Sequence, residues 1–329
     1  MKEVCLGTIG SGFIVHYILD NVMKTDGVKL AAVYSRTIEK AKELGDAYHC
    51  TNVYTDLDRM LEDETVNTVY VASPNILHYE QTKKALLAGR HVWCEKPFTT
   101  SAEKAEELIA LAEEKGLYLV ETAPTTFLPN YRILKQNLSA VGRIRMVMGS
   151  YSQYSSRYDV LKRGELPNIF NPEMAGGCLM DINFYNILLT VSLFGLPEDV
   201  KYTPNIFPEV GCDTSGTAVL KYPDFTAVCS GAKDTWGNNF YQIQGEDGFI
   251  DIHGGASTLG EIEVVTREGG KVRSNQPETD RWFYEVQELT RLFLADDKEA
   301  IDARHTILRN TAEVLSKLRE SAGIRFPGD

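Results

Sequence analysis

The segment Gly7-Thr8-Ile9-Gly10-Ser11-Gly12-Phe13-Ile14 places glycines between a predicted strand and a predicted helix. Backbone without side chains lets a phosphate approach closely, and a helix N-terminus offers it free N–H groups. The spacing is typical of a pyrophosphate site, although Val15 stands where the pattern G-x-G-x-x-G/A has a small residue. A tight turn without a ligand is the alternative. We predict that a dinucleotide contacts Gly10, Gly12, Phe13 and Ile14.

Ser35-Arg36-Thr37 follows the second predicted strand. An NAD site usually carries an acidic residue there, which binds the ribose 2′-hydroxyl. Arg36 can instead pair with a 2′-phosphate, and Ser35 adds a hydrogen-bond donor. The segment therefore favours NADP(H), with NAD(H) possible, while a solvated surface charge is the alternative for Arg36.

Two further polar segments follow predicted parallel strands, at the edge where doubly wound sheets bind ligands. They are Ala72-Ser73-Pro74-Asn75-Ile76-Leu77-His78 and Cys94-Glu95-Lys96-Pro97. A solvated ion pair is the alternative for Glu95 and Lys96. We expect these segments to line the cofactor cleft with Ser73, Pro74, Asn75, His78, Glu95 and Lys96.

Asp181 and Tyr185 lie at the start of an apolar predicted helix, after Gly176-Gly177. Their i, i+4 spacing would place them on one helix face, where both can reach one ligand. Alternatively, Asp181 is a helix N-terminal charge and Tyr185 a core aromatic.

Short apolar runs alternate with amphipathic stretches through the first third of the chain. Single helices between buried strands indicate a parallel, doubly wound α/β sheet, so we predict a dinucleotide-binding Rossmann domain over 1–122. The predicted strands are 4–9, 30–34, 69–72, 91–94 and 117–121, and the predicted helices are 13–24, 38–48, 80–88 and 102–115.

Beyond Ala123, longer strand-like runs are joined by hairpin signals such as Pro223-Asp224, Glu246-Asp247-Gly248 and Glu268-Gly269-Gly270. This turn chemistry indicates antiparallel pairing and an α+β domain over 123–329. The predicted strands are 144–151, 216–222, 225–232, 240–244 and 262–266, and two helices are predicted over 281–295 and 302–321.

Composition narrows the possible partners. The length of 329 residues predicts two domains, and 34 basic against 46 acidic residues give a net charge of −12, which disfavours nucleic acid. We see no signal peptide and no apolar run near the roughly 18 residues of a membrane span, so we expect a cytoplasmic protein without a membrane partner. The six cysteines form no CxxC pair and the six histidines show no ligand spacing, so we expect reduced thiols and no metal.

GTIGSGFI, VYSR, ASPNILH, CEKP and GGCLMDINFY, in this order, resemble the Gfo/Idh/MocA oxidoreductase family. The chain looks most like its dimeric dihydrodiol dehydrogenase group, which includes NADP-dependent D-xylose dehydrogenases, because Tyr185 replaces the family's common histidine. The resemblance implies a Rossmann domain, then a substrate-binding domain with a large, mostly antiparallel open sheet. It also implies a homodimer or homotetramer.

The resemblance implies catalytic roles as well. Lys96 would contact nicotinamide ribose and substrate, often through a cis Lys-Pro bond; Asp181 would be the motif carboxylate and Tyr185 the proton donor or acceptor. A tyrosine, with a pKa of about 10, needs a nearby cation to work near neutrality, and Lys96 could supply it. We therefore expect hydride transfer between NADP(H) and a CH–OH/C=O group. The alternative is an NAD(P)-binding regulator without turnover.

Departures from the family pattern bear on the substrate. Thr125 and Thr126 stand where related dehydrogenases usually carry an aromatic residue and an arginine, and Asn183 stands where a glycine is common. A sugar or cyclic polyol is thus at least as plausible a substrate as a trans-dihydrodiol. Candidates for setting this specificity are Tyr154, Arg157, Tyr158 and Trp282.

Overall fold

The computed structural model describes residues 3–329, which form two compact units. The first unit contains the described residues up to Thr122 together with Trp282–Leu308, and the second contains Ala123–Arg281 and Arg309–Asp329. The division 1–122 and 123–329 that we predict differs from these units in one respect. The segment Trp282–Leu308 packs with the first unit, although it follows the second in sequence.

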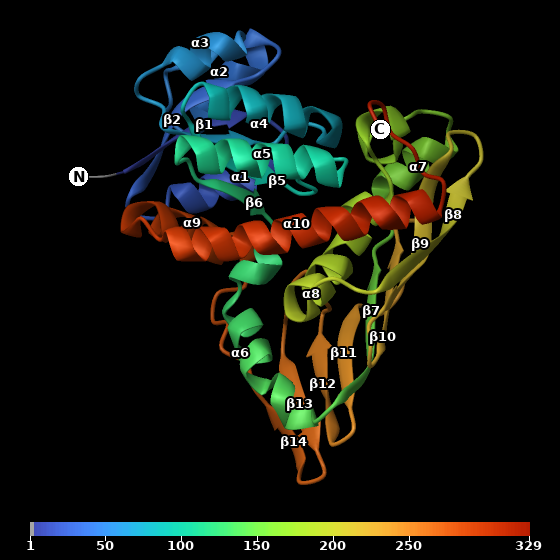
Figure 1. The fold of residues 1–329 in the computed structure, drawn as a ribbon. Helices are drawn as coiled ribbons and strands as arrows, with labels where there is room; N and C mark the ends of the chain where they lie inside the picture. The colour runs from blue at the N-terminus through green and yellow to red at the C-terminus, as the bar shows by residue number, and fades with distance from the viewer. Residues whose placement is uncertain (1–2) are drawn as a thin grey trace. The chain divides into compact units, whose positions relative to one another are not determined.

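The first unit is built on a six-stranded parallel sheet of order β3-β2-β1-β4-β5-β6 (Figure 1). All five strand pairs are parallel, and every residue of β4 is buried, as expected for a sheet covered on both faces. The predicted Rossmann architecture is confirmed. The strands are β1 (Val4–Ile9), β2 (Val28–Tyr34), β3 (Val53–Tyr54), β4 (Thr68–Val71), β5 (His91–Glu95) and β6 (Leu119–Thr122).

Helices connect these strands, and a side chain caps the first turn of two of them, α3 and α5. The Ser101 hydroxyl accepts a hydrogen bond from the Lys104 amide at 3.3 Å at the start of α5, and Gly116 ends the helix in the left-handed region. The helices are α1 (Phe13–Val22), α2 (Ile38–Ala47), α3 (Leu57–Glu62), α4 (His78–Leu87) and α5 (Ala102–Lys115).

The returning segment belongs to α9 (Arg281–Ala295) and the first part of α10 (Lys298–Ser321). Trp282 stacks on Tyr17 with ring centroids 4.4 Å apart, and His305 Nε2 lies 3.0 Å from the Leu119 carbonyl oxygen. These contacts seat the segment on the parallel-sheet unit.

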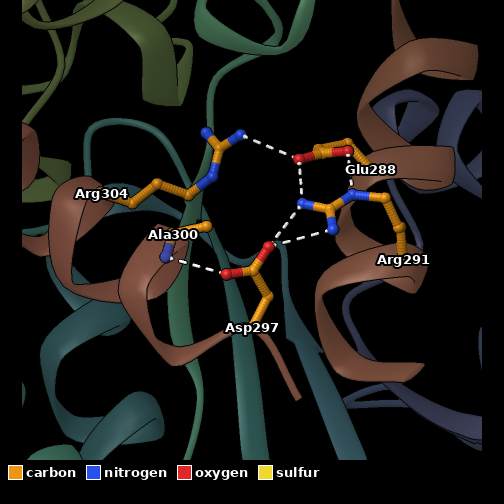
Figure 2. A network of polar contacts seen from close by, with 5 residues as sticks. All are labelled: Glu288, Arg291, Asp297, Ala300 and Arg304. Carbon is orange, nitrogen blue, oxygen red and sulfur yellow. Dashed lines mark hydrogen bonds and ion pairs between the residues drawn. The ribbon is translucent and has the colours of Figure 1, made fainter. Parts of the chain in front are cut away.

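An ionic cluster fixes the corner between α9 and α10 (Figure 2). Arg291 donates to Glu288 at 2.8 Å and to Asp297 at 3.0 Å, while Asp297 accepts from the Ala300 amide at 3.1 Å. The Ala300 amide and Arg291 hold the pKa of Asp297 below its usual value. Asp297 thereby caps α10 and ties it to α9.

The second unit contains an eight-stranded sheet of order β14-β13-β12-β11-β7-β10-β9-β8 (Figure 1). Only β7 and β10 are parallel to each other, so the predicted mostly antiparallel sheet is confirmed. The strands are β7 (Ile144–Ser152), β8 (Asp199–Phe207), β9 (Cys212–Lys221), β10 (Thr226–Ala232), β11 (Phe240–Gly245), β12 (Gly248–His253), β13 (Ile262–Thr266) and β14 (Gly269–Val272), and the helices are α6 (Pro129–Asn137), α7 (Ser156–Lys162) and α8 (Phe184–Phe194).

Two glycines let the helical segment before and within α8 approach the sheet closely. A Cβ atom at Gly231 of β10 would lie 2.7 Å from the Asn183 Cβ, and one at Gly149 of β7 would lie 2.9 Å from the Asn186 side-chain oxygen. Both asparagines are buried and donate to carbonyl oxygens of β10, Asn183 to Cys229 at 2.9 Å and Asn186 to Ser230 at 3.0 Å. Their buried N–H groups are thus hydrogen-bonded, whereas the Asn186 side-chain oxygen is buried without a hydrogen-bond partner among the described residues.

Among residues 3–329, one helical stretch, Pro172–Phe194, is long and apolar enough to cross a membrane by length and composition alone. Its most apolar part is 78% buried inside the protein, as in the core helix of a folded domain. From the sequence we predict no membrane span in this stretch.

Candidate functional site

The glycine-rich turn lies between β1 and α1. Gly10 has a φ of +112°, and a Cβ atom there would lie 2.6 Å from the Ala72 carbonyl oxygen. Gly12 has ordinary extended geometry as the N-cap of α1, and a Cβ atom there would have no neighbour within 4 Å. Gly10 is therefore required by the fold, whereas Gly12 leaves open space at the helix N-terminus.

The first turn of α1 presents the two apolar residues that we predict as cofactor contacts. Phe13 is 76% exposed and Ile14 is partly exposed. Val15 is fully buried, so the residue that departs from the glycine pattern serves the core. An exposed phenylalanine beside a helix N-terminus is available to a ligand.

Ser35 and Arg36 follow β2 at the same edge of the sheet. Ser35 is buried, and its hydroxyl lies 3.5 Å from the hydroxyl of Ser11 in the glycine-rich turn. Arg36 is exposed. The end of β2 is thus connected to the glycine-rich turn, with a guanidinium group beside it.

The segment after β4 contains Ser73, Pro74, Asn75 and His78. His78 is buried, with Nε2 at 2.9 Å from the Ser73 carbonyl oxygen and Nδ1 at 3.0 Å from the Pro97 carbonyl oxygen. Burial lowers the pKa of His78, and a neutral ring donates to only one of these acceptors at a time. His78 therefore lies between the loops after β4 and β5 and donates a hydrogen bond to one of them at a time. Pro74 and Asn75 are partly exposed.

Glu95 ends β5 and is buried. It accepts hydrogen bonds from the Tyr70 hydroxyl at 2.7 Å and the Thr122 hydroxyl at 2.8 Å. Burial raises its pKa, while these bonds and the positive charge of Lys96 act in the opposite direction. Lys96 itself is partly exposed and is joined to Pro97 by a cis peptide bond, as the family resemblance implies.

A second carboxyl group, Glu121, accepts from the Phe98 amide at 2.8 Å. Burial, with a contribution from Glu95, raises its pKa to about 8, while Lys96 lowers it. Two acidic side chains, Glu95 from β5 and Glu121 from β6, thus interact electrostatically with Lys96.

In the second unit, Asp181 forms a close ion pair with Lys233, which follows β10. Lys233 is 5% exposed, so its ammonium group is removed from water and needs this partner. Asp181 lies in a π-helical turn, Leu179–Asn183, where the sequence predicts the start of a regular helix. Single π-turns occur often at functional sites.

Asp213, on β9, fixes the N-terminal end of this turn. It accepts from the Leu179 amide at 2.7 Å and from the Tyr202 hydroxyl at 2.7 Å. Burial raises the pKa of Asp213 to about 6, although these donors and Lys233 lower it.

Tyr185, in the first turn of α8, is 6% exposed. Its ring lies 6.0 Å from that of Tyr151 on β7, and the Arg281 guanidinium lies 5.4 Å from its ring centroid. The Arg281 guanidinium thus lies over the Tyr185 ring in a cation–π arrangement. Of the three predicted catalytic residues, Lys96 belongs to the first unit, and Asp181 and Tyr185 to the second.

Sequence reasoning did not identify Ser11, Glu121, Tyr151, Lys233 or Arg281. Ser11 lies inside the glycine motif and could have been included on that ground. Lys233 meets Asp181 across 52 residues of sequence, so only the packing of the π-helical turn on β10 reveals it. Arg281 immediately precedes Trp282, a candidate specificity residue, but lies in none of the sequence motifs.

Family models match both units. The model described as an oxidoreductase family with an NAD-binding Rossmann fold (GFO_IDH_MocA) matches residues 5–122, and the GFO/IDH/MocA C-terminal domain model matches residues 135–251. The NADP(+)-dependent scyllo-inositol 2-dehydrogenase IolU of Bacillus subtilis is 36% identical over 325 residues, covering 98% of both chains.

Two further comparisons extend over the whole chain. Trans-1,2-dihydrobenzene-1,2-diol dehydrogenase of Xenopus tropicalis is 26% identical, covering 98% of this chain and 97% of that one. Among solved structures, KijD10, a 3-ketoreductase from Actinomadura kijaniata in complex with NADP and TDP-benzene, superposes with a TM-score of 0.84 at 22% identity. It covers 97% of this chain and 98% of its own.

Alanine substitutions at Gly10 and Gly12 test which of the two glycines the fold requires. Gly10→Ala should lower the free energy of unfolding by about 2 kcal/mol or more, because φ is positive and the Ala72 carbonyl blocks a methyl group. Gly12→Ala is the matched control and should change it by less than about 1 kcal/mol. Urea unfolding measures both, and equal effects would contradict the local geometry.

Asp213 should make stability depend on pH. Because its folded pKa is above the ordinary value near 3.8, the wild-type protein loses stability from this group as pH rises through roughly 4 to 6. Asp213→Asn keeps the acceptor and removes the titration. Relative to wild type, its free energy of unfolding should therefore improve by up to about 3 kcal/mol between pH 4 and pH 7. Denaturant titrations at both pH values test this, and a constant difference would refute it.

Proposed function

Because the chain belongs to the Gfo/Idh/MocA oxidoreductase family, we propose that it transfers hydride between NADP(H) and a CH–OH/C=O group of a sugar, cyclic polyol or trans-dihydrodiol. The observation that carries the proposal is the open helix N-terminus at Gly12, in a chain 36% identical to an NADP(+)-dependent inositol dehydrogenase. The nicotinamide cofactor, when bound, supplies or accepts the hydride.

The residues around the glycine-rich turn fit such a cofactor. The space at Gly12 would admit a pyrophosphate to the N-terminus of α1. The buried Ser73 hydroxyl has no hydrogen-bond partner within residues 3–329, and a ribose or phosphate group would supply one. We assign cofactor binding to Gly10, Gly12, Phe13, Ile14, Ser35, Arg36, Ser73, Pro74, Asn75, His78, Glu95 and Lys96.

Preference for NADP(H) over NAD(H) rests on Arg36. An exposed guanidinium at the end of β2 can pair with a 2′-phosphate and stack on adenine. The neighbouring Ser35 hydroxyl is close to Ser11 and can act as an additional donor.

Proton transfer is assigned to Tyr185. Reduction of a carbonyl leaves an alkoxide that must receive a proton, and oxidation requires the reverse transfer. Arg281 lies over the Tyr185 ring within the second unit, and we assign Lys96 to bind the substrate oxygen and assist the same proton transfer. Asp181, held by Lys233, would accept a hydrogen bond from a substrate hydroxyl and fix its orientation.

Removing the guanidinium should weaken NADPH binding selectively. Arg36→Ala should raise the dissociation constant for NADPH about tenfold or more and leave that for NADH within about twofold, since only NADPH carries the 2′-phosphate. Fluorescence titration measures both constants. Equal losses for the two cofactors would remove Arg36 from the specificity assignment.

Loss of the Tyr185 hydroxyl should stop proton transfer without affecting the cofactor. Tyr185→Phe should lower kcat by about a hundredfold or more with unchanged NADPH affinity. Tyr151→Phe is the matched control, because it removes a hydroxyl from the neighbouring ring, and it should stay close to wild type. Absorbance of reduced nicotinamide reports turnover on a panel of aldoses, cyclic polyols and diols.

A Tyr185→Phe variant with wild-type turnover would overturn the proton-transfer assignment. NADPH binding by the wild-type protein without turnover on any member of the panel would instead support an NAD(P)-binding regulator.

A further inference from the structure

Trp236 is the most exposed large hydrophobic side chain of the second unit, at 77% exposure. Its indole stacks on the ring of Tyr154, with centroids 5.5 Å apart and planes 7° from parallel. We name this pair the aromatic platform. A flat aromatic surface left open to water carries a hydrophobic cost that a ligand would relieve.

The Tyr154 side of the platform is fixed by polar and aromatic contacts. The Tyr154 hydroxyl donates to Asp159 at 2.7 Å and accepts from Lys162 at 2.7 Å, and these two residues form an ion pair with each other. The Tyr158 ring packs edge-on against Tyr154 with centroids 5.8 Å apart. Tyr154 is therefore held in one orientation.

The Trp236 side is fixed through its backbone loop. Ser155 donates to the Lys233 carbonyl oxygen at 2.9 Å, and the Ser152 amide donates to the Asn239 side chain at 2.8 Å. A Cβ atom at Gly237 would lie 3.0 Å from the Ser152 side chain. On both sides of Trp236 the loop is thus hydrogen-bonded to the last residue of β7 or to the segment that follows it.

The same loop connects the platform to the proposed site. Lys233, whose side chain pairs with Asp181, precedes Trp236 by three residues, so their Cα atoms are at most about 11 Å apart. Asp234 accepts from the hydroxyls of Thr214 at 2.7 Å and Ser215 at 3.0 Å. Aromatic side chains with a few polar groups nearby are common components of small-molecule sites.

We propose that the aromatic platform binds the C–H face of a cyclitol or pyranose ring whose hydroxyls are equatorial. In such a ring the axial hydrogens form an apolar face, and the hydroxyls on the rim remain free to bond with groups such as Asp181. An axial hydroxyl on that face would be pressed against the indole and lose its hydrogen bonds with water. The platform therefore selects by ring stereochemistry, an inference that rests on the proposed function.

Binding without turnover tests the platform directly. The protein is saturated with NADPH, because a polyol cannot be oxidised by the reduced cofactor, and scyllo-inositol, methyl β-D-glucopyranoside and D-chiro-inositol are titrated by calorimetry. We expect scyllo-inositol and methyl β-D-glucopyranoside to bind more tightly than D-chiro-inositol, whose two axial hydroxyls lie on opposite faces of the ring and block both. Trp236→Ala should weaken binding of the preferred ring at least about tenfold and remove the discrimination.

Two further variants test whether binding requires a flat aromatic ring or only a large side chain. Trp236→Phe should retain most of the affinity, whereas Trp236→Leu should resemble Trp236→Ala. Because the side chain is exposed, all three variants should unfold at nearly the wild-type temperature.

Each contrary result has a distinct meaning. If NADPH itself does not bind, the proposed function fails. If NADPH binds but none of the three rings does, or if Trp236→Ala binds them like wild type, the platform proposal is wrong while the oxidoreductase assignment stands. If Trp236→Ala changes only the mass measured by light scattering, the indole contacts a second copy of the chain, and the proposal is likewise overturned.

Discussion

The site in the second unit depends on how closely a helical segment can approach its sheet. Side chains on β7 and β10 would hold that segment away, and glycines at 149 and 231 remove this obstacle. At the shorter distance the buried amides of Asn183 and Asn186 reach carbonyl oxygens of β10. These bonds set the position of the π-helical turn, and with it Asp181 and Tyr185.

Buried charged side chains have different partners in the two units. In the first, Glu95 and Glu121 lie at the base of Lys96, and hydrogen bonds from Tyr70, Thr122 and Phe98 only partly offset their burial. In the second, the ammonium of Lys233 is matched by the carboxylate of Asp181. A buried ion pair of this kind contributes little net stability but fixes the orientation of its members. For Asp181 that orientation is what hydrogen bonding to a substrate requires.

Much of the fold could be predicted from the sequence because its signals are local. Continuous apolar runs such as β4 and the capped helix α5 follow from periodicity and end residues. Strand β3 has only two residues, which is too short for a periodic hydrophobic pattern. Strand β14 is wholly exposed, so its glycines were interpreted as part of a turn. Motif residues could be identified in the same way. The stacking of Trp236 on Tyr154 depends on strand register, and the pairing of Lys233 with Asp181 depends on the packing of a helical turn on β10. No local pattern contains either.

The assignment of Trp282–Leu308 to the first unit has a consequence for synthesis on the ribosome. The parallel sheet leaves the exit tunnel first, but the two helices α9 and α10, which supply Trp282 and His305 to it, emerge only after the whole of Ala123–Arg281. Domains usually fold in the order in which they are translated. Here the nascent amino-terminal segment must wait with part of its surface uncovered, and a ribosome that stops early releases a polypeptide in which the first unit is never completed.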